Sequence, residues 1–313
     1  MLRTLLRAVP AIILAAAATL TAPTALAAAP TPTPAPAVAA DPAVPGAFPV
    51  AWTDLTVSAA GRSYSARVWY PGRSAGANAP VAQGLHPGLA FGHGFFQDIS
   101  KYENTLRHYA SWGFITVTPK SQGGISPSHS GFADDLNAAL TWLTAQNSAT
   151  GSRFAGAVDT GRYALSGHSM GGGAALLAAS RNPAVRSVST LAAAETNPSA
   201  VSASAALTIP AQYVGGSRDT VAGVEGHQRK MYDAKPAPTQ LRVVTGGFHC
   251  GFTDSGGFGC DSGSVARAEQ QRLTRAVTTT YLLYTLGLDT SLRDQVWGAA
   301  AQSLPGVVYT AKP

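Results

Sequence analysis

Alternating apolar and polar residues mark the start of the predicted fold, and short apolar runs continue it. Trp52 to Val57 and Tyr64 to Tyr70 alternate with a period of two around the turn-like segment Ala60-Gly61-Arg62. This pattern predicts an antiparallel β-hairpin. Six short apolar runs after the hairpin have the length of buried strands. They are Gly88 to Phe91, Phe114 to Thr118, Tyr163 to Leu165, Val188 to Leu191, Ala211 to Val214 and Leu241 to Val244.

Segments of helical length separate these apolar runs. They are Tyr102 to Trp112, Phe132 to Gln146, Met170 to Arg181, Val221 to Asp233 and Ser264 to Leu286. Strands and helices in near-regular alternation predict an α/β fold, with a mostly parallel sheet covered by helices on both faces. The chain between Leu191 and Ala211 is too short for a separate lid domain. We therefore expect an open cleft at the carboxyl ends of the strands, where reactive groups gather in such sheets.

The first 27 residues have the three parts of a secretory signal peptide. Arg3 and Arg7 supply a positive start, Ala11 to Leu20 form an apolar core, and Ala25-Leu26-Ala27 fits a small-x-small cleavage site. We therefore expect the mature protein to be secreted and extracellular. Because the apolar run is too short to span a membrane comfortably, we expect no stable membrane anchor.

A stretch rich in proline, alanine and threonine over residues 28–49 predicts an extended linker, and one compact domain over residues 50–313 follows it. Charged residues make up 12% of the chain, the net charge is +6, and Lys and Arg are scattered. Nucleic-acid binding, which needs basic clusters, is therefore not expected. No cofactor and no metal is expected, and the expected state is a monomer.

The strongest candidate for chemistry is the segment Gly167-His168-Ser169-Met170-Gly171. It lies directly after the predicted strand Tyr163 to Leu165 and directly before an alanine-rich helix. This context is typical of a nucleophile elbow, in which a serine lies on a sharp, strained turn that needs small neighbours. A helix that begins at the serine also aims free N–H groups at the place where an oxyanion forms. We predict Ser169 as the nucleophile.

A serine nucleophile of this kind needs an acid and a histidine base that follow it in that order along the chain. His249 comes after the last predicted strand, behind the flexible Gly246-Gly247 pair, and is the predicted base. Asp219 follows the strand Ala211 to Val214 and is the preferred acid, while Glu195 after the preceding strand is the alternative. His168, next to the serine, is expected to point away from the serine hydroxyl. Four further histidines are interpreted as structural or solvated: His86, His108, His129 and His227.

An oxyanion hole takes one N–H from the residue after the nucleophile and a second from the loop after an inner strand. Met170 is the predicted first donor. The segment Gly92-His93-Gly94-Phe95 follows the strand Gly88 to Phe91, and its His-Gly pattern predicts the Phe95 amide as the second donor. An ordinary tight turn is the alternative interpretation of the same residues.

Cys250 and Cys260 are the two cysteines of the chain. In an oxidising compartment an even pair usually bonds, whereas a metal site would need further ligands at suitable spacing. We predict a disulfide between Cys250 and Cys260. A bond that closes a loop of this size contributes about 2 to 4 kcal/mol in the chain-entropy description, and it would hold His249 near Ser169.

Several segments resemble the bacterial cutinase and polyester hydrolase branch of the α/β-hydrolases. They are Gly94-Phe95, Trp112 to Val117, Asp134 to Leu140 and, most specifically, Gly167 to Gly173. This group includes poly(ethylene terephthalate) hydrolases and is related to dienelactone hydrolases. The resemblance implies an α/β-hydrolase fold and hydrolysis of carboxylic esters through an acyl-enzyme, with Phe95 also forming a wall of the acyl pocket.

The chain departs from that group in two places. Members active on aromatic polyesters usually carry a Trp shortly after the sixth strand, where this chain reads Ala192-Ala193-Ala194-Glu195-Thr196. The cysteine pair beside His249 also differs from the usual C-terminal disulfide. Small and polymeric esters are equally compatible with the sequence. A secreted acyltransferase or peptidase with the same triad is an alternative, since the fold does not fix the leaving group, and a non-catalytic binding protein is another.

Overall fold

The computed structural model describes residues 41–257 and 259–313. Its strands form one ten-stranded sheet in the order β10-β9-β8-β7-β6-β4-β5-β2-β1-β3. The strands are β1 Val50–Ala59, β2 Arg62–Pro71, β3 Gly76–Ala77, β4 His86–Gly92, β5 Ile115–Pro119, β6 Val158–His168, β7 Val185–Leu191, β8 Ala211–Gly216, β9 Thr239–Val244 and β10 Val307–Lys312. The predicted signal peptide, residues 1–27, lies outside the described residues.

The predicted hairpin and all six predicted inner strands are present, and the fold is the mostly parallel α/β sheet expected. β1 and β2 pair antiparallel, with Trp52 opposite Trp69, while β5, β4, β6, β7, β8 and β9 run parallel to one another. Every residue of β4 and of β5 is buried, which explains why these strands read as continuous apolar runs rather than alternating ones. The carboxyl ends of the parallel strands therefore meet at one edge.

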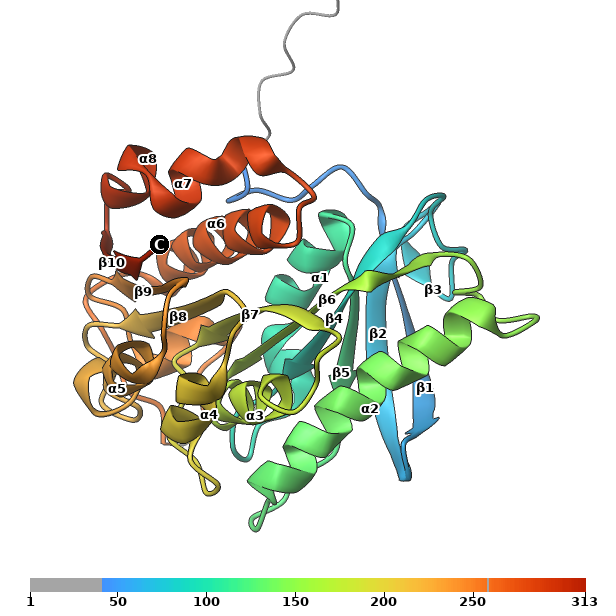
Figure 1. The fold of residues 1–313 in the computed structure, drawn as a ribbon, viewed down its shortest axis with the longest axis horizontal. Coiled ribbons are helices and arrows are strands. Elements are labelled where there is room, and N and C mark those ends of the chain that lie inside the picture. Colours follow the sequence, from blue (N-terminus) through green and yellow to red (C-terminus); the bar gives the residue numbers. More distant parts are fainter. Residues whose placement is uncertain (1–40, 258) are drawn as a thin grey trace, which may run out of the picture. The chain divides into compact units, whose positions relative to one another are not determined.

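Helices cover both faces of this sheet (Figure 1). Helices α1 and α6 pack on one face, over a core that includes Leu89 and Leu273, and α2 and α3 pack on the other, over a core that includes Leu136 and Leu176. The helices are α1 Glu103–Ser111, α2 His129–Ser148, α3 Met170–Ala179, α4 Ala200–Ala206, α5 Gln228–Ala234, α6 Arg267–Thr285, α7 Arg293–Trp297 and α8 Ala299–Gln302. No helix in the described part of the chain is long and apolar enough to cross a membrane.

Helix α5 starts well after its predicted first residue. The sequence predicted a helix over Val221 to Asp233, but α5 begins at Gln228. The Asp219 carboxylate accepts hydrogen bonds from the N–H groups of Val221 and Ala222, at 2.9 and 2.7 Å. A side chain that binds the backbone two and three residues ahead offers a turn in place of a helix, so this segment forms a loop that contains only a single 3-10 turn, Val224–Gly226.

The N-terminal boundary of the packed body also differs from the sequence estimate. Residues 41–49, the end of the predicted linker, lie against α1 and the residue that follows it: Trp112 donates a hydrogen bond to the Val44 carbonyl at 2.9 Å, and the Phe48 N–H donates one to the Ser111 carbonyl at 3.0 Å. Ala43 is buried as well. The packed unit therefore begins before Val50.

Candidate active site

Ser169 lies on the sharp turn between β6 and α3, where its backbone adopts φ 55° and ψ −122°. A residue other than glycine is strained in this region, and such strain is typical of functional turns. A side chain on Gly167 would overlap the backbone of Gly171, and one on Gly171 would overlap the backbone of Gly92. The glycines of the elbow therefore allow strand, turn and neighbouring loop to approach closely, which presents the serine hydroxyl at the edge of the sheet.

The structure brings Ser169, His249 and Asp219 together from three loops. His249 Nε2 lies 2.9 Å from Ser169 Oγ, and His249 Nδ1 lies 2.8 Å from Asp219 Oδ2. All three residues are buried. Because the carboxylate accepts the Nδ1–H, the imidazole presents an unprotonated Nε2 to the serine hydroxyl. This is the arrangement in which a histidine can remove the serine proton.

Glu195 does not take part in this arrangement. Its side chain is exposed and accepts a hydrogen bond from the N–H of Val201, near the start of α4, at 3.0 Å. Its backbone N–H donates to Nδ1 of His227 at 2.9 Å. Of the two candidate acids, the geometry therefore favours Asp219.

The two predicted oxyanion donors come from the two segments expected. Met170 directly follows Ser169 as the first residue of α3, and Phe95, in the loop after β4, lines the same pocket as Ser169. Among the described residues, neither amide donates to a protein acceptor. Free backbone N–H groups at a helix start are suited to stabilise a developing negative charge.

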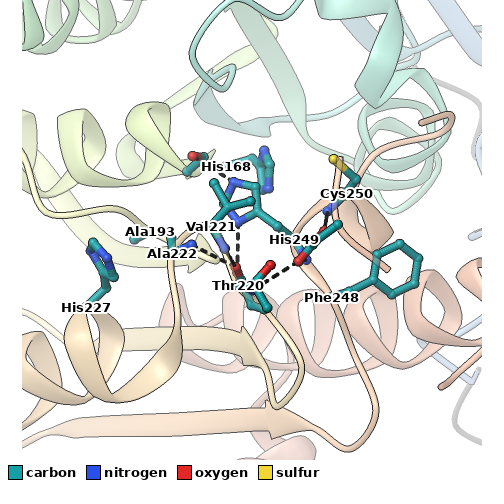
Figure 2. A network of polar contacts seen from close by, with 12 residues as sticks. His168, Ala193, Thr220, Val221, Ala222, His227, Phe248, His249 and Cys250 are labelled. Atoms are coloured by element: carbon teal, nitrogen blue, oxygen red, sulfur yellow. Dashed lines mark hydrogen bonds and ion pairs between the residues drawn. The ribbon is translucent and has the colours of Figure 1, made fainter. Parts of the chain in front are cut away.

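His168 contacts His249, which the sequence did not predict. Its ring centroid lies 4.5 Å from that of His249, and the two rings lie side by side in Figure 2. The Tyr102 hydroxyl accepts a hydrogen bond from the Gly94 N–H at 2.9 Å and also lies within hydrogen-bond distance, 2.9 Å, of His168 Nδ1. Burial, and next the charge of His249, hold the pKa of His168 well below its ordinary value.

Tyr102 and His168 thus tie the loop that carries Phe95 to the elbow that carries Ser169. No spacing signal in the sequence points to this contact, because the two residues are 66 positions apart and their meeting depends on packing. His86 and His108 are buried and contact polar groups of the fold away from Ser169. His86 Nδ1 lies 3.1 Å from the Gly113 carbonyl, and His108 Nε2 lies 3.0 Å from the Thr279 hydroxyl.

A pocket of about 640 Å³ opens beside Ser169 and His249. Its rim carries apolar side chains that are exposed to solvent: Phe96 is 63% exposed and Ile125 is 82% exposed. The other apolar lining residues are Phe95 and Val221. Large apolar groups displayed together around a concave site mark a surface that binds apolar material.

Cys250, next to His249 along the chain, forms a disulfide bond with Cys260. The bond closes a loop that borders the pocket, through Thr253 and Gly257. In the described part of the chain, no group of three or more His, Cys, Asp or Glu side chains is arranged to hold a metal ion.

Comparison with known proteins decides the family. A family described as PET hydrolase-like matches residues 21–258, which is most of the chain and includes Ser169, Asp219 and His249. The chain belongs to the PET hydrolase-like family. The open sheet with helices on both faces is the α/β-hydrolase arrangement expected for it, and the sequence resemblance is confirmed.

Individual relatives of this PET hydrolase-like chain match over a shorter range. It is 34% identical to "Cutinase est2" of Thermobifida alba over 131 residues, which is 42% of this chain and 41% of the relative. It is 32% identical to "Bis(hydroxyethyl) terephthalate hydrolase" of Streptomyces coelicolor over 130 residues, 42% of this chain and 39% of the relative. The matched region thus spans about two fifths of the length of these relatives.

Proposed function

We propose that this protein is a serine carboxylic ester hydrolase that acts through an acyl-enzyme on Ser169. The observation that carries the proposal is the hydrogen-bonded chain from Ser169 Oγ through His249 to Asp219, at 2.9 and 2.8 Å. Family membership and relatives named for cutin and terephthalate ester hydrolysis support it.

In the first half of the reaction, Ser169 Oγ attacks the ester carbonyl carbon while His249 Nε2 takes the hydroxyl proton. The Asp219 carboxylate stabilises the imidazolium, and the Phe95 and Met170 amides hold the oxyanion. When the tetrahedral intermediate collapses, the ester C–O bond breaks, and the leaving alcohol takes the proton from His249. The acyl group is then bound to Ser169.

In the second half, His249 removes a proton from a water molecule that attacks the acyl-serine carbonyl. A second tetrahedral intermediate forms in the same oxyanion hole. Its collapse returns the proton to Ser169 Oγ and releases the carboxylic acid. The free enzyme is restored, and one water has been consumed for each ester cleaved.

The apolar lining of the pocket favours esters that carry an apolar acyl group or an aromatic group. The proposed substrates include polymeric esters. Phe95, Phe96, Ile125 and Val221 form an apolar rim that can contact such groups. This contact does not need a tryptophan after β7, where the chain has Ala192 to Ala194. We further propose that the protein is secreted and functions outside the cell, which the N-terminal pattern and the disulfide support.

The test is release of nitrophenol from short- and medium-chain nitrophenyl esters by the unaltered chain and by Ser169→Ala. We expect turnover by the unaltered chain and a fall of at least about 1,000-fold in kcat for the variant, since the nucleophile is removed. Preferential transfer of the acyl group to an added alcohol rather than to water, measured in the same assay, would identify an acyltransferase. Equal background rates in both proteins would overturn the proposal and favour a non-catalytic binding protein.

A further inference from the structure

The carboxylate of Asp261 binds the backbone of two active-site loops at once. Oδ2 accepts hydrogen bonds from the N–H groups of His249, at 2.8 Å, and Thr220, at 3.2 Å, while Oδ1 accepts one from the Cys250 N–H at 3.0 Å. Thr220, His249 and Cys250 lie close together in Figure 2. Hydrogen bonds to an ionised acceptor are stronger than those between neutral groups.

These two loops carry the acid and the base of the proposed triad. Thr220 directly follows Asp219, and one of the three N–H donors belongs to His249 itself. The bond between the Asp219 and His249 side chains is 2.8 Å long, and its geometry depends on how the two backbones are placed. By binding both backbones, the Asp261 carboxylate therefore fixes the distance between the Asp219 and His249 side chains.

The disulfide places Asp261 at this position. Asp261 follows Cys260, whose bond to Cys250 brings the end of the loop back to the residue beside His249. Arg267 donates hydrogen bonds to the carbonyls of Cys250 and Thr253 on the other side of the same loop. Asp261 is thus tethered through the disulfide of its neighbour Cys260, and the Cys250 residue to which it is hydrogen-bonded is also held by Arg267.

We propose that Asp261 is a positioning residue for the triad, which holds the Asp219 loop and the His249 loop in register. The inference rests on the proposed function, since positioning matters for a triad that turns over. Among the described residues, Asp261 is not part of the lining of the pocket beside Ser169 and makes no hydrogen bond to the serine hydroxyl. Its removal therefore lowers the rate of the chemical steps and leaves substrate binding largely unchanged.

The test is steady-state hydrolysis of one nitrophenyl ester by Asp261→Ala and Asp261→Asn. We expect Asp261→Ala to lower kcat about 10- to 100-fold, with KM within about twofold, because small misplacement of catalytic groups costs factors of this size. Asp261→Asn should recover part of the rate, since its amide oxygen can still accept from Thr220 and His249.

Asp294→Ala is the matched control. Asp294 also accepts two backbone N–H groups, from Ala299 at 2.9 Å and Ala300 at 3.2 Å, but it lies in α7, outside the candidate site. A loss of kcat in Asp261→Ala that Asp294→Ala does not show supports the proposal. An equal loss in both variants, or a change confined to KM, would overturn it.

Proton NMR of the imidazole supplies a readout that does not depend on turnover. The Nδ1 proton shared between His249 and Asp219 gives a far-downfield resonance when it is shielded from solvent exchange. We expect this resonance in the unaltered chain and in Asp294→Ala, and its loss in Asp261→Ala. A resonance that persists in Asp261→Ala contradicts the proposal, whereas absence of ester hydrolysis by the unaltered chain contradicts the proposed function instead.

Discussion

Gly171 shows how a single residue limits the candidate site. A methyl group on it would overlap the backbone of Gly92 at the end of β4, and backbone cannot move aside as a flexible side chain can. The loop after Gly92 carries the Phe95 amide, so a shift there displaces one of the two proposed oxyanion donors. The close contact of two glycines therefore links the elbow to the oxyanion hole.

Replacing Gly171 with Ala is expected to destabilise the fold by about 2 kcal/mol, within the range for overpacking, and to lower kcat more than it raises KM. Chemical denaturation and ester kinetics would measure the two effects. Gly226→Ala is the matched control, because a Cβ at Gly226 meets nothing within 4 Å. Unchanged stability and kcat in Gly171→Ala would contradict this prediction, because they would show that the backbone around Gly92 can shift without loss of stability or activity.

At this scale the sequence predicted Ser169, Asp219 and His249 because each follows a recognisable strand, and the chain order excludes most other residues. Tyr102, His168 and Asp261 were not predicted. Their contacts join distant positions, such as Asp261 and Thr220, which are 41 residues apart. Such pairs are brought together by tertiary packing and leave no periodic signal in the sequence.

Among the elements, β9 depends on one buried cation. The Arg242 guanidinium donates hydrogen bonds to the carbonyls of Ala301, at 2.7 Å, and Gln295, at 3.1 Å, and it stacks on the ring of Tyr309. These acceptors lie in α7 and α8, and Tyr309 lies in β10. Burial lowers the pKa of Arg242 to about 10, so it stays charged at neutral pH and joins the C-terminal elements to the sheet.

Arg242→Met should therefore destabilise the protein by about 2 to 4 kcal/mol, because it leaves several buried carbonyls without a donor. The loss of stability should appear first in the C-terminal segment, since Arg242 contacts α7, α8 and β10 there. Thermal melting gives the overall change, and hydrogen exchange locates it. Uniform exchange across the chain, with no excess over residues 290–313, would contradict this assignment.

The inner strands were predictable because burial on both faces gives unmistakable apolar runs. The short C-terminal elements were not, since β10 has only its first residue buried and α7 and α8 are five and four residues long. The late start of α5 had a different cause, because the side chain of Asp219 competes with the helix for backbone donors. Local patterns thus fail where packing or a side chain decides the outcome.

Across the whole molecule, buried histidines make stability depend on pH. Burial lowers the pKa of His108 from 6.5 to about 4 and also lowers the pKa of His168 and His86. The unfolded chain therefore binds more protons than the folded chain between these values. Stability is fully present above about pH 6.5 and falls as the pH drops toward 4, by up to about 3 kcal/mol for His108 alone.

Melting temperatures measured from pH 8 to pH 4 should fall below about pH 6.5. His108→Gln should show a shallower fall, because an amide cannot take up the proton that the unfolded histidine binds. The Asp54 ion pair contributes mainly below this window, since the Arg67 guanidinium lowers the pKa of Asp54 from 3.8 to about 2. A flat profile in the unaltered chain, or the same slope in His108→Gln, would contradict the assignment.

The outer edge of β1 is largely unpaired, which matters when many copies of the protein are close together. Along its described length, β1 is covered on that side only by the two residues of β3, at Ala51 and Trp52. Next to this gap, Asp54 forms ion pairs with Arg67 and Lys120. A second copy that tried to extend the sheet would have to strip water from these charges. Densely packed copies of the protein therefore meet a built-in barrier to fibril growth.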